Sequence, residues 1–252
     1  MKGGSIVKSH ELYAGFLGLL FLLWWIVLAV RPLDRKDWAL ENALVVVIVG
    51  TLVATRRRFP FSRISYTLLF LFLCLHEVGA HYTYAKVPYD HWLEILTGGR
   101  YDHLAALHRN HFDRLAHFSF GLLCAYPIRE VFLRVAEARG FWGYYLPLDV
   151  TMAFSMVFEI LEWVVAQIFG GNLGIAYLGS QGDVWDAQKD MGLACLGAIL
   201  AMTVTAAINL RLQRDFGREW AESLRVKGRR PLGENVLLRL LTRRKRKTDL
   251  SA

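Results

Sequence analysis

Acidic and histidine side chains recur at helical spacing in the apolar part of this 252-residue sequence. The stretch HEVGAH places Glu77 and His81 four residues apart, and NHFDRLAH does the same for Asp113 and His117. Residues three or four apart lie on one face of a helix, so each pair can point toward a common partner. Carboxylate and imidazole together suit divalent Zn, Fe or Mn, which makes metal binding one hypothesis for these pairs.

Two later stretches add further carboxylates with the same kind of spacing. EILEW places Glu159 and Glu162 three residues apart. GSQGDVWDAQKDM carries three aspartates spaced three and four apart, at Asp183, Asp186 and Asp190. Seven carboxylates in these four stretches face only Arg114 and Lys189 nearby. The excess negative charge calls for another positive partner, and divalent cations and shared protons are the two candidates.

The elements that must position these residues are apolar runs of membrane-spanning length. The chain is 54% hydrophobic with a mean hydropathy of +0.30, which is high for a soluble domain. Because a helix needs about 20 residues to span a bilayer, we expect an all-α bundle of six transmembrane helices. The runs cover residues 12–30, 40–55, 64–82, 112–128, 146–169 and 190–210.

The distribution of Lys and Arg predicts the orientation of these spans. With six spans, 22 of these residues fall on the side of the two termini and 7 on the other side. The positive-inside rule therefore predicts a cytoplasmic N-terminus and a cytoplasmic C-terminus. With this topology all four polar stretches lie in the outer half of the bundle. The loop before the fourth span contains VPYDHWLEILTGG (87–99), which we expect to form a short interfacial helix.

A basic tail follows the last apolar run. Residues 211–252 hold 13 of the 30 Lys and Arg and 5 of the 22 Asp and Glu, whereas residues 1–210 are formally neutral. We therefore expect a membrane domain at 1–210 and a cytoplasmic tail at 211–252. The segment ENVLLRLLTRRKRK (234–247) suits binding to anionic inner-leaflet lipid, and a solvated disordered tail is the alternative. Nucleic acid is not an expected partner beside so much apolar sequence.

Burying the ionisable groups of the four stretches in a bilayer is costly. One charge at mid-bilayer costs roughly 2.5–3.5 kcal/mol, and the whole set would cost on the order of 10–20 kcal/mol if left uncompensated. We therefore expect these groups to face the bundle interior and to form a functional site. The candidate metal ligands are Glu77, His81, Asp113, His117, Asp186 and Asp190. Glu159 or Glu162 would act as general base, and Arg114 would hold an anionic group.

Several of these motifs, in this order, resemble the YjdF-type family of bacterial inner-membrane proteins. The resemblance rests on HEVGAHY, NHFDRLAHFSFG, YPIRE (126–130), EILEW and GSQGDVWDAQKDM, and it covers most of residues 10–210. It implies a multi-spanning protein of the bacterial inner membrane and implies no reaction. The stretch DMGLACLGA (190–198) is also similar to VanZ-like membrane proteins.

The functional hypothesis that follows is a metal-dependent enzyme acting on a lipid or periplasmic substrate at the outer leaflet, with hydrolysis as one reaction. A proton-coupled or ion transporter using the same acids is the first alternative. A structural or assembly protein, in which the polar groups only fix helix packing, is the second. A transporter would need polar residues that continue to the inner face, whereas YTLLFLFLCL (66–75) and FGLLCAY (120–126) are apolar there.

Overall fold

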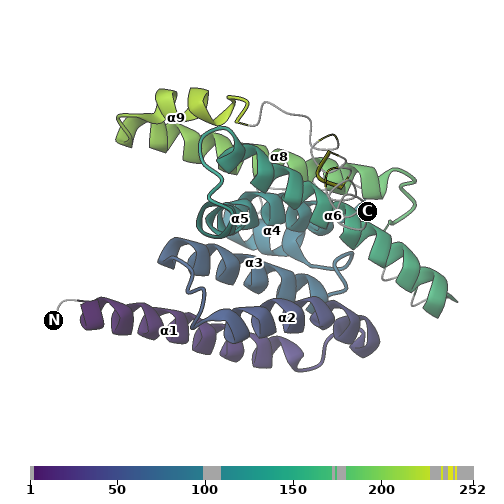
Figure 1. Cartoon of the computed structure of the whole chain (residues 1–252). Coiled ribbons are helices and arrows are strands. Elements are labelled where there is room, and N and C mark those ends of the chain that lie inside the picture. Colours follow the sequence, from purple (N-terminus) through teal and green to yellow (C-terminus); the bar gives the residue numbers. More distant parts are fainter. Residues whose placement is uncertain are drawn as a thin grey trace, which may run out of the picture.

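The computed structural model describes residues 3–98, 109–171 and 180–227 and the isolated positions 174, 234, 238–240 and 242. Every regular element in these residues is a helix, which confirms the predicted all-α class for this part of the chain. Figure 1 shows a stacked bundle with α1 at one edge and α9 at the other. The helices are α1 (Gly3–Ala29), α2 (Arg35–Thr55), α3 (Arg63–His81), α4 (Tyr89–Thr97), α5 (Phe112–Val135), α6 (Trp142–Phe169), α8 (Asp186–Leu212) and α9 (Phe216–Ser223).

Five of these helices are long and apolar enough to cross a membrane. They are α1 from Ser9 onward, α2, α3, α6 and α8. All five begin earlier than the sequence predicted: α1 at Gly3 rather than 12, α2 at Arg35 rather than 40, α3 at Arg63 rather than 64, α6 at Trp142 rather than 146, and α8 at Asp186 rather than 190. The polar residues that precede each apolar run therefore belong to its helix. The apolar run marks only part of the helix, whereas the hydrogen-bonded turns extend beyond it.

Helix α5 is a sixth long helix, and it lies at the centre of the bundle. It is 24 residues long, but its charged residues keep it outside the set of strongly apolar helices. It packs against α3, α6 and α8, while α1 and α2 reach the bundle through α3 (Figure 1). A central helix surrounded by others can carry polar side chains without exposing them to lipid.

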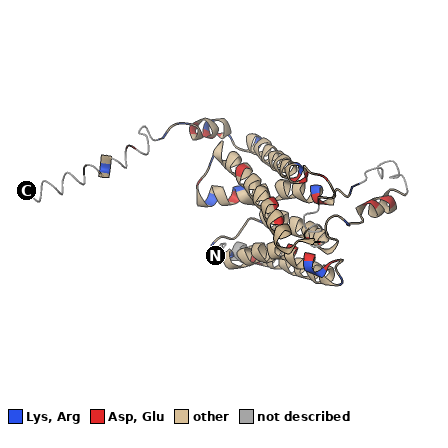
Figure 2. Ribbon diagram, turned by 90° about the vertical axis from the view of Figure 1, so that its right-hand side faces the viewer, with Lys and Arg blue, Asp and Glu red and all other residues tan. Residues whose placement is uncertain are grey.

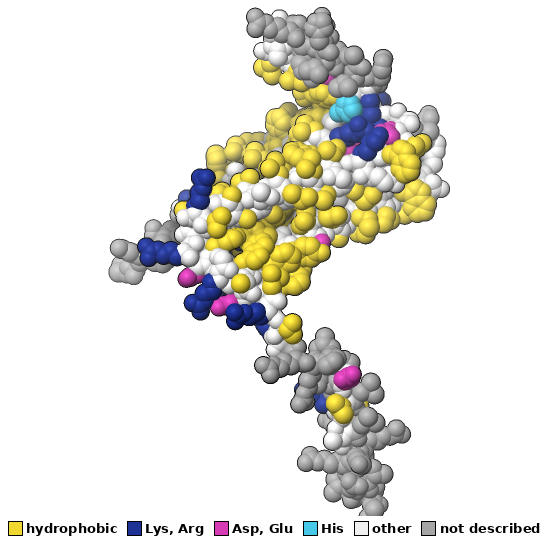
Figure 3. All heavy atoms as spheres, turned by 90° about the horizontal axis from the view of Figure 1, so that it is seen from above, with side chains coloured by type: hydrophobic (Ala, Val, Ile, Leu, Met, Phe, Trp, Pro, Cys, Tyr) yellow, Lys and Arg dark blue, Asp and Glu magenta, His cyan; other side chains and the backbone are white. Residues whose placement is uncertain are grey.

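The distribution of side chains is that of a protein surrounded by hydrocarbon. Among the described residues, buried polar side chains are about as numerous as buried apolar ones, whereas many Leu, Val, Ile, Phe and Trp side chains are exposed. Figure 2 shows long helical stretches without charged residues, with Lys and Arg mostly near helix ends. Figure 3 shows hydrophobic side chains covering the band between two ends that carry Lys and Arg. This pattern supports a helical membrane protein.

Helices α5 and α8 run in the same direction and approach each other so closely that only glycine fits at their contact. A Cβ atom built on Gly121 would lie 1.9 Å from the Ala194 carbonyl oxygen, and one on Gly197 would lie 2.2 Å from the Phe118 carbonyl oxygen. Small residues at such positions let two backbones touch, as is common between membrane helices. The close crossing fixes the first turns of α5 and α8 side by side.

The packing of the bundle continues past residue 210. The ring of Trp220 in α9 lies 5.7 Å from that of Tyr144 in α6, and Trp142 Nε1 donates a hydrogen bond of 2.9 Å to the Ser223 carbonyl oxygen. The first turns after α8 therefore belong to the packed structure. Most of the predicted lipid-binding segment 234–247 lies outside the described residues, so it stays a prediction. The short helix expected near 87–99 is present as α4, which ends at Gly98 with φ 62°.

Candidate metal centre

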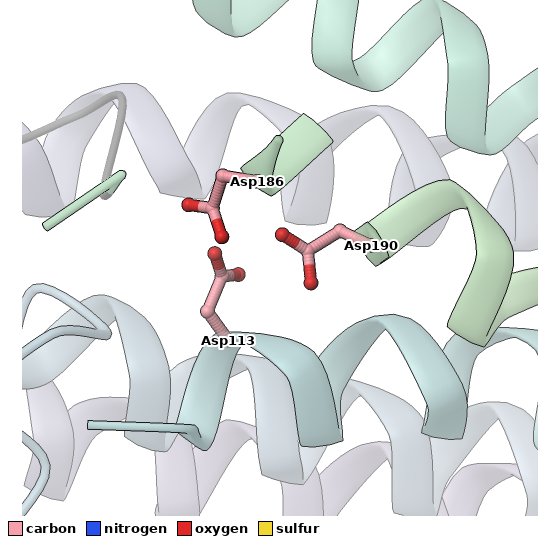
Figure 4. A group of neighbouring side chains, drawn as sticks. All are labelled: Asp113, Asp186 and Asp190. Carbon is pink, nitrogen blue, oxygen red and sulfur yellow. The ribbon is translucent and has the colours of Figure 1, made fainter. Parts of the chain in front are cut away.

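Three aspartates converge where the first turns of α5 and α8 meet. Asp113 comes from α5, and Asp186 and Asp190 lie one turn apart on α8. Each offers a carboxylate oxygen, and these three oxygens lie within 4.8 Å of one another. Figure 4 shows the three carboxylates pointing toward one common space, and all three residues are buried. We call this group the aspartate trio.

The trio holds more negative charge than its neighbours neutralise. Within the described part of the chain, neither Asp113 nor Asp190 forms an ion pair with a Lys or Arg. Asp190 Oδ1 is buried and has no hydrogen-bond partner there either. Because an unpaired buried carboxylate oxygen is costly, this arrangement favours a bound cation or a proton in the space between the three side chains.

A histidine and two glutamates extend the trio toward α6. His117 lies one turn after Asp113 on α5, and its Nε2 is 3.7 Å from Asp113 Oδ1 and 3.3 Å from Glu159 Oε1. Glu162 follows Glu159 on the same face of α6 and is buried. One ring nitrogen, Nε2, therefore faces both a carboxylate of the trio and a carboxylate of α6. This nitrogen can take a proton from one of the two carboxyl groups and give it to the other.

Two arginines bind the aspartates nearest the end of the bundle. Arg109 donates hydrogen bonds to Asp186 and, at 2.6 Å, to the Ser180 carbonyl oxygen. Arg114 Nη2 donates to Asp183 Oδ2 at 2.7 Å and lies 3.7 Å from Asp186 Oδ1. Both guanidinium groups thus lie on one side of the trio, where they can also hold an anionic group of a substrate.

Asp183 is held by three cations and is not one of the trio. Its Oδ2 accepts a hydrogen bond of 2.5 Å from Lys189 in addition to the contacts with Arg114 and Arg109. The hydrogen bond from Lys189, followed by one from the Trp185 backbone amide, lowers the pKa of Asp183 to about 2. Asp183 therefore stays a carboxylate and connects the start of α8 to α5 by charge.

The loop segments before α5 and α8 are joined directly. The Asn110 amide donates to Gln181 Oε1, and Gln181 Nε2 donates to the Asn110 carbonyl oxygen, each at 3.0 Å. The neighbouring His111 has its pKa lowered below 6.5 by burial and then by the positive charge of Arg114 and Arg109. The stretch GSQGDVWDAQKDM thus has two roles. Gln181 in its first half joins the loop before α8 to the loop before α5, and its second half supplies two of the three aspartates.

The structure does not bring His81 and Glu77 into the trio. His81 Nδ1 lies 2.7 Å from the Leu28 carbonyl oxygen, so its ring faces α1. Glu77 is fully buried beside Asn42 of α2. Of the six predicted metal ligands, Asp113, His117, Asp186 and Asp190 lie together. The candidate catalytic residues Glu159, Glu162 and Arg114 lie around them.

The sequence reasoning missed a second group of buried acids, formed by α2 and α3. Asp37 and Glu41 of α2 are both buried, and Asp37 Oδ1 and Glu41 Oε2 have no hydrogen-bond partner in the described residues. His76 of α3 contacts the Glu41 carbonyl oxygen at 3.2 Å and the Tyr84 hydroxyl at 2.5 Å. The i,i+4 spacing of Asp37 and Glu41 was a usable signal, but the predicted span began after Asp37. Arg109 lies in a loop, as the sequence predicted, but its contact with Asp186 was not predicted.

Comparison with known proteins assigns the chain to a family without a stated reaction. Residues 13–211 match a family described as predicted membrane protein (DUF2238). The chain is also 37% identical over 185 residues to the inner membrane protein YjdF of Escherichia coli K12. The aligned region covers 73% of this chain and 84% of that protein. No solved structure matches the chain. The match spans the helices that build the aspartate trio, and the YjdF-type resemblance expected from the sequence motifs is confirmed: this chain is a bacterial inner-membrane protein that belongs to the DUF2238 family.

Proposed function

We propose that this protein binds a divalent cation at the aspartate trio and uses it to hydrolyse an anionic lipid or periplasmic substrate at the outer leaflet. The observation that carries the proposal is the convergence of three buried carboxylates, two of which have no Lys or Arg ion-pair partner among the described residues. We also infer six spans with both termini in the cytoplasm, because α5 is of spanning length and Lys and Arg concentrate on the side of the termini.

The donor set fits a hard or borderline divalent ion. Three carboxylates with one imidazole one turn away suit Mn, Fe or Zn, and helical bundles build such sites from carboxylates on facing helices. Such an ion would make water a nucleophile at neutral pH by lowering its pKa. His117 and Glu159 are the proposed acceptors of the proton that the water loses, since Nε2 of His117 lies 3.7 Å from Asp113 Oδ1 of the trio and 3.3 Å from Glu159 Oε1. Glu162 is the alternative base.

The two arginines indicate the charge of the substrate. Arg109 and Arg114 lie on the loop side of the trio with 13% and 20% of their side chains exposed. An arriving phosphate or carboxylate group can replace part of their contact with Asp183 and Asp186 by bidentate hydrogen bonds. We therefore assign Arg114, together with Arg109, to binding the anionic part of the substrate.

The close helix crossing below the trio favours an enzyme over a transporter. A carrier needs a route that continues from the site to the other side of the membrane. Directly below the trio, the backbones of α5 and α8 touch at Gly121 and Gly197 and leave no room for a methyl group. This contact supports a site that opens to one side only.

Metal analysis of the purified full-length protein tests the proposal. Wild-type protein exposed to Mn, Fe or Zn and then desalted should retain the ion in a stoichiometric amount by plasma mass spectrometry. Asp190→Asn and Asp113→Asn should lose it, because each removes a charged ligand of the trio. Glu77→Gln is the matched control, since it also neutralises a buried acid but lies outside the trio. Wild-type protein that retains none of the three ions would overturn the proposal and leave a structural polar network.

A further inference from the structure

The end of the bundle opposite the aspartate trio contains a large groove beside α1. The groove has a volume of about 1070 Å³ and is lined by α1, α2, α3, the α2–α3 connection and the C-terminal part of α5. The groove arises because α1 packs along α3, whereas the described hydrogen bond from α1 to α2 lies near the C-terminal end of α1. Tyr13 is hydrogen-bonded to Thr67 of α3 at 2.6 Å, whereas the contact with α2 is made by Trp25, whose Nε1 donates to Asn42 Oδ1 at 2.5 Å.

The walls of the groove are apolar and the rim is basic. Gly18 and Phe21 of α1 face Val49 and Leu52 of α2 across it. Gly18 has no side chain to occupy the groove, and a Cβ built on it meets no atom within 4 Å. At the rim, the connection from α2 to α3 places Arg56 and Arg57 in the lining of the groove, and residues 56–62 contain no acid. An apolar groove that ends at guanidinium groups has the polarity of a phospholipid, with chains below and a charged headgroup above.

Two of the rim arginines are available to a ligand. Arg56 and Arg57 line the groove and are exposed, and neither makes a hydrogen bond or ion pair with another described residue. The other polar groups of the rim are already engaged, since Glu130 accepts hydrogen bonds from Ser62, Ser65 and Arg134. Glu11 and His10 complete the rim on the α1 side. Arg56 and Arg57 outnumber the one carboxylate of the rim without a described partner, Glu11, so the mouth of the groove is net positive.

We propose that the groove between α1 and α2 is a binding site for one anionic phospholipid of the bilayer. Its acyl chains lie along Gly18, Phe21 and Leu52, and its phosphate is bound by Arg56 and Arg57. Basic pockets between membrane helices on the cytoplasmic side bind anionic headgroups in this way, and the Lys and Arg distribution predicts this end to be cytoplasmic. The groove volume of about 1070 Å³ is far larger than a packing defect and slightly exceeds the roughly 300–1000 Å³ that is typical of ligand pockets.

Lipid titration of the delipidated full-length protein tests this site. Native mass spectrometry should show one dioleoyl phosphatidylglycerol bound per chain, with a higher affinity than for dioleoyl phosphatidylcholine, which has the same chains. Each arginine near an anionic headgroup contributes roughly five-fold in affinity, so Arg56→Gln with Arg57→Gln should lower binding by about 25-fold. Arg58→Gln is the matched control, because Arg58 is the next residue but does not line the groove.

A second variant tests the groove rather than the rim. Gly18→Leu adds a side chain on the α1 wall, at a position where a Cβ meets no atom within 4 Å, and should abolish phosphatidylglycerol binding while the protein stays monodisperse. Equal affinity for the two lipids, or full binding by both the double arginine variant and Gly18→Leu, would refute the site. A dimer that Gly18→Leu converts to monomer would also refute it, because a second copy of the chain would then occupy the groove.

Discussion

Replacing Gly121 with alanine tests how the aspartate trio is held together. A Cβ at residue 121 would lie 1.9 Å from the Ala194 carbonyl oxygen and 2.8 Å from the Ala198 amide nitrogen. Ordinary van der Waals contact starts at 3.4 Å, so the shortfall at Ala194 is 1.5 Å. Because both contacts are backbone atoms, α5 and α8 must move apart. Overpacking of this kind costs about 1–3 kcal/mol, which lowers the melting temperature of a chain this long by about 2–12 °C.

The assay is thermal unfolding of the detergent-purified protein, with metal content measured on the same samples. Gly192→Ala is the matched control, because it makes the same change on α8 where a Cβ meets nothing within 4 Å. That variant should melt at or slightly above the wild-type temperature, since alanine is favoured over glycine in a helix by about 1 kcal/mol. Gly121→Ala should also bind metal more weakly, because separating α5 from α8 moves Asp113 away from Asp186. Wild-type stability of Gly121→Ala, or equal losses in both variants, would refute the reasoning.

Three further predictions concern the two ends of the bundle. The hydrogen bond from Lys189 lowers the pKa of Asp183 to about 2, so its stabilising effect is present above its ordinary pKa of 3.8 and lost toward pH 2. Asp183→Asn should therefore melt below wild type at pH 7 and at the same temperature near pH 2. Arg109→Gln frees Asp186 from a competing cation and should tighten divalent-cation binding in calorimetric titrations; weaker binding would contradict that competition. Trp220→Ala should undock α9 and cost less than the 3–5 kcal/mol of a fully buried Trp, with metal content unchanged.

The sequence predicted much of the site because spacing and depth together restrict where a side chain can go. Asp113 and His117 share a face of α5, and Asp186 and Asp190 share a face of α8, as their i,i+4 spacing requires. Each pair also stands at the start of its helix, so both pairs lie at the same end of the bundle. What spacing did not reveal is the contact of α5 with α8, which depends on Gly121 meeting Ala194 across two helices far apart in sequence.

Helix spacing could not predict which neighbour a polar face would meet. Glu77 and His81 lie one turn apart on α3, but three other helices, α1, α2 and α5, pack around α3. His81 is near the end of the helix, where α1 offers the Leu28 carbonyl oxygen, while Glu77 is buried beside α2. The acids of α2 were missed for a different reason. The predicted span began at residue 40, so Asp37 lay outside it and its i,i+4 spacing with Glu41 went unused, yet both residues are helical and buried.

The placement of the arginines argues that the trio is more than a packing device. If the polar groups served only to fix helix contacts, the available guanidinium groups would neutralise the deepest carboxylates, since a buried unpaired charge costs most. Instead, Arg109 and Arg114 bind Asp183 and Asp186 at the loop side. Asp190, which is 1% exposed, keeps an oxygen without a partner among the described residues. The cation proposed above, or a proton shared between the three aspartates, would account for this distribution, because either compensates the inner carboxylates and leaves the arginines at the loop side.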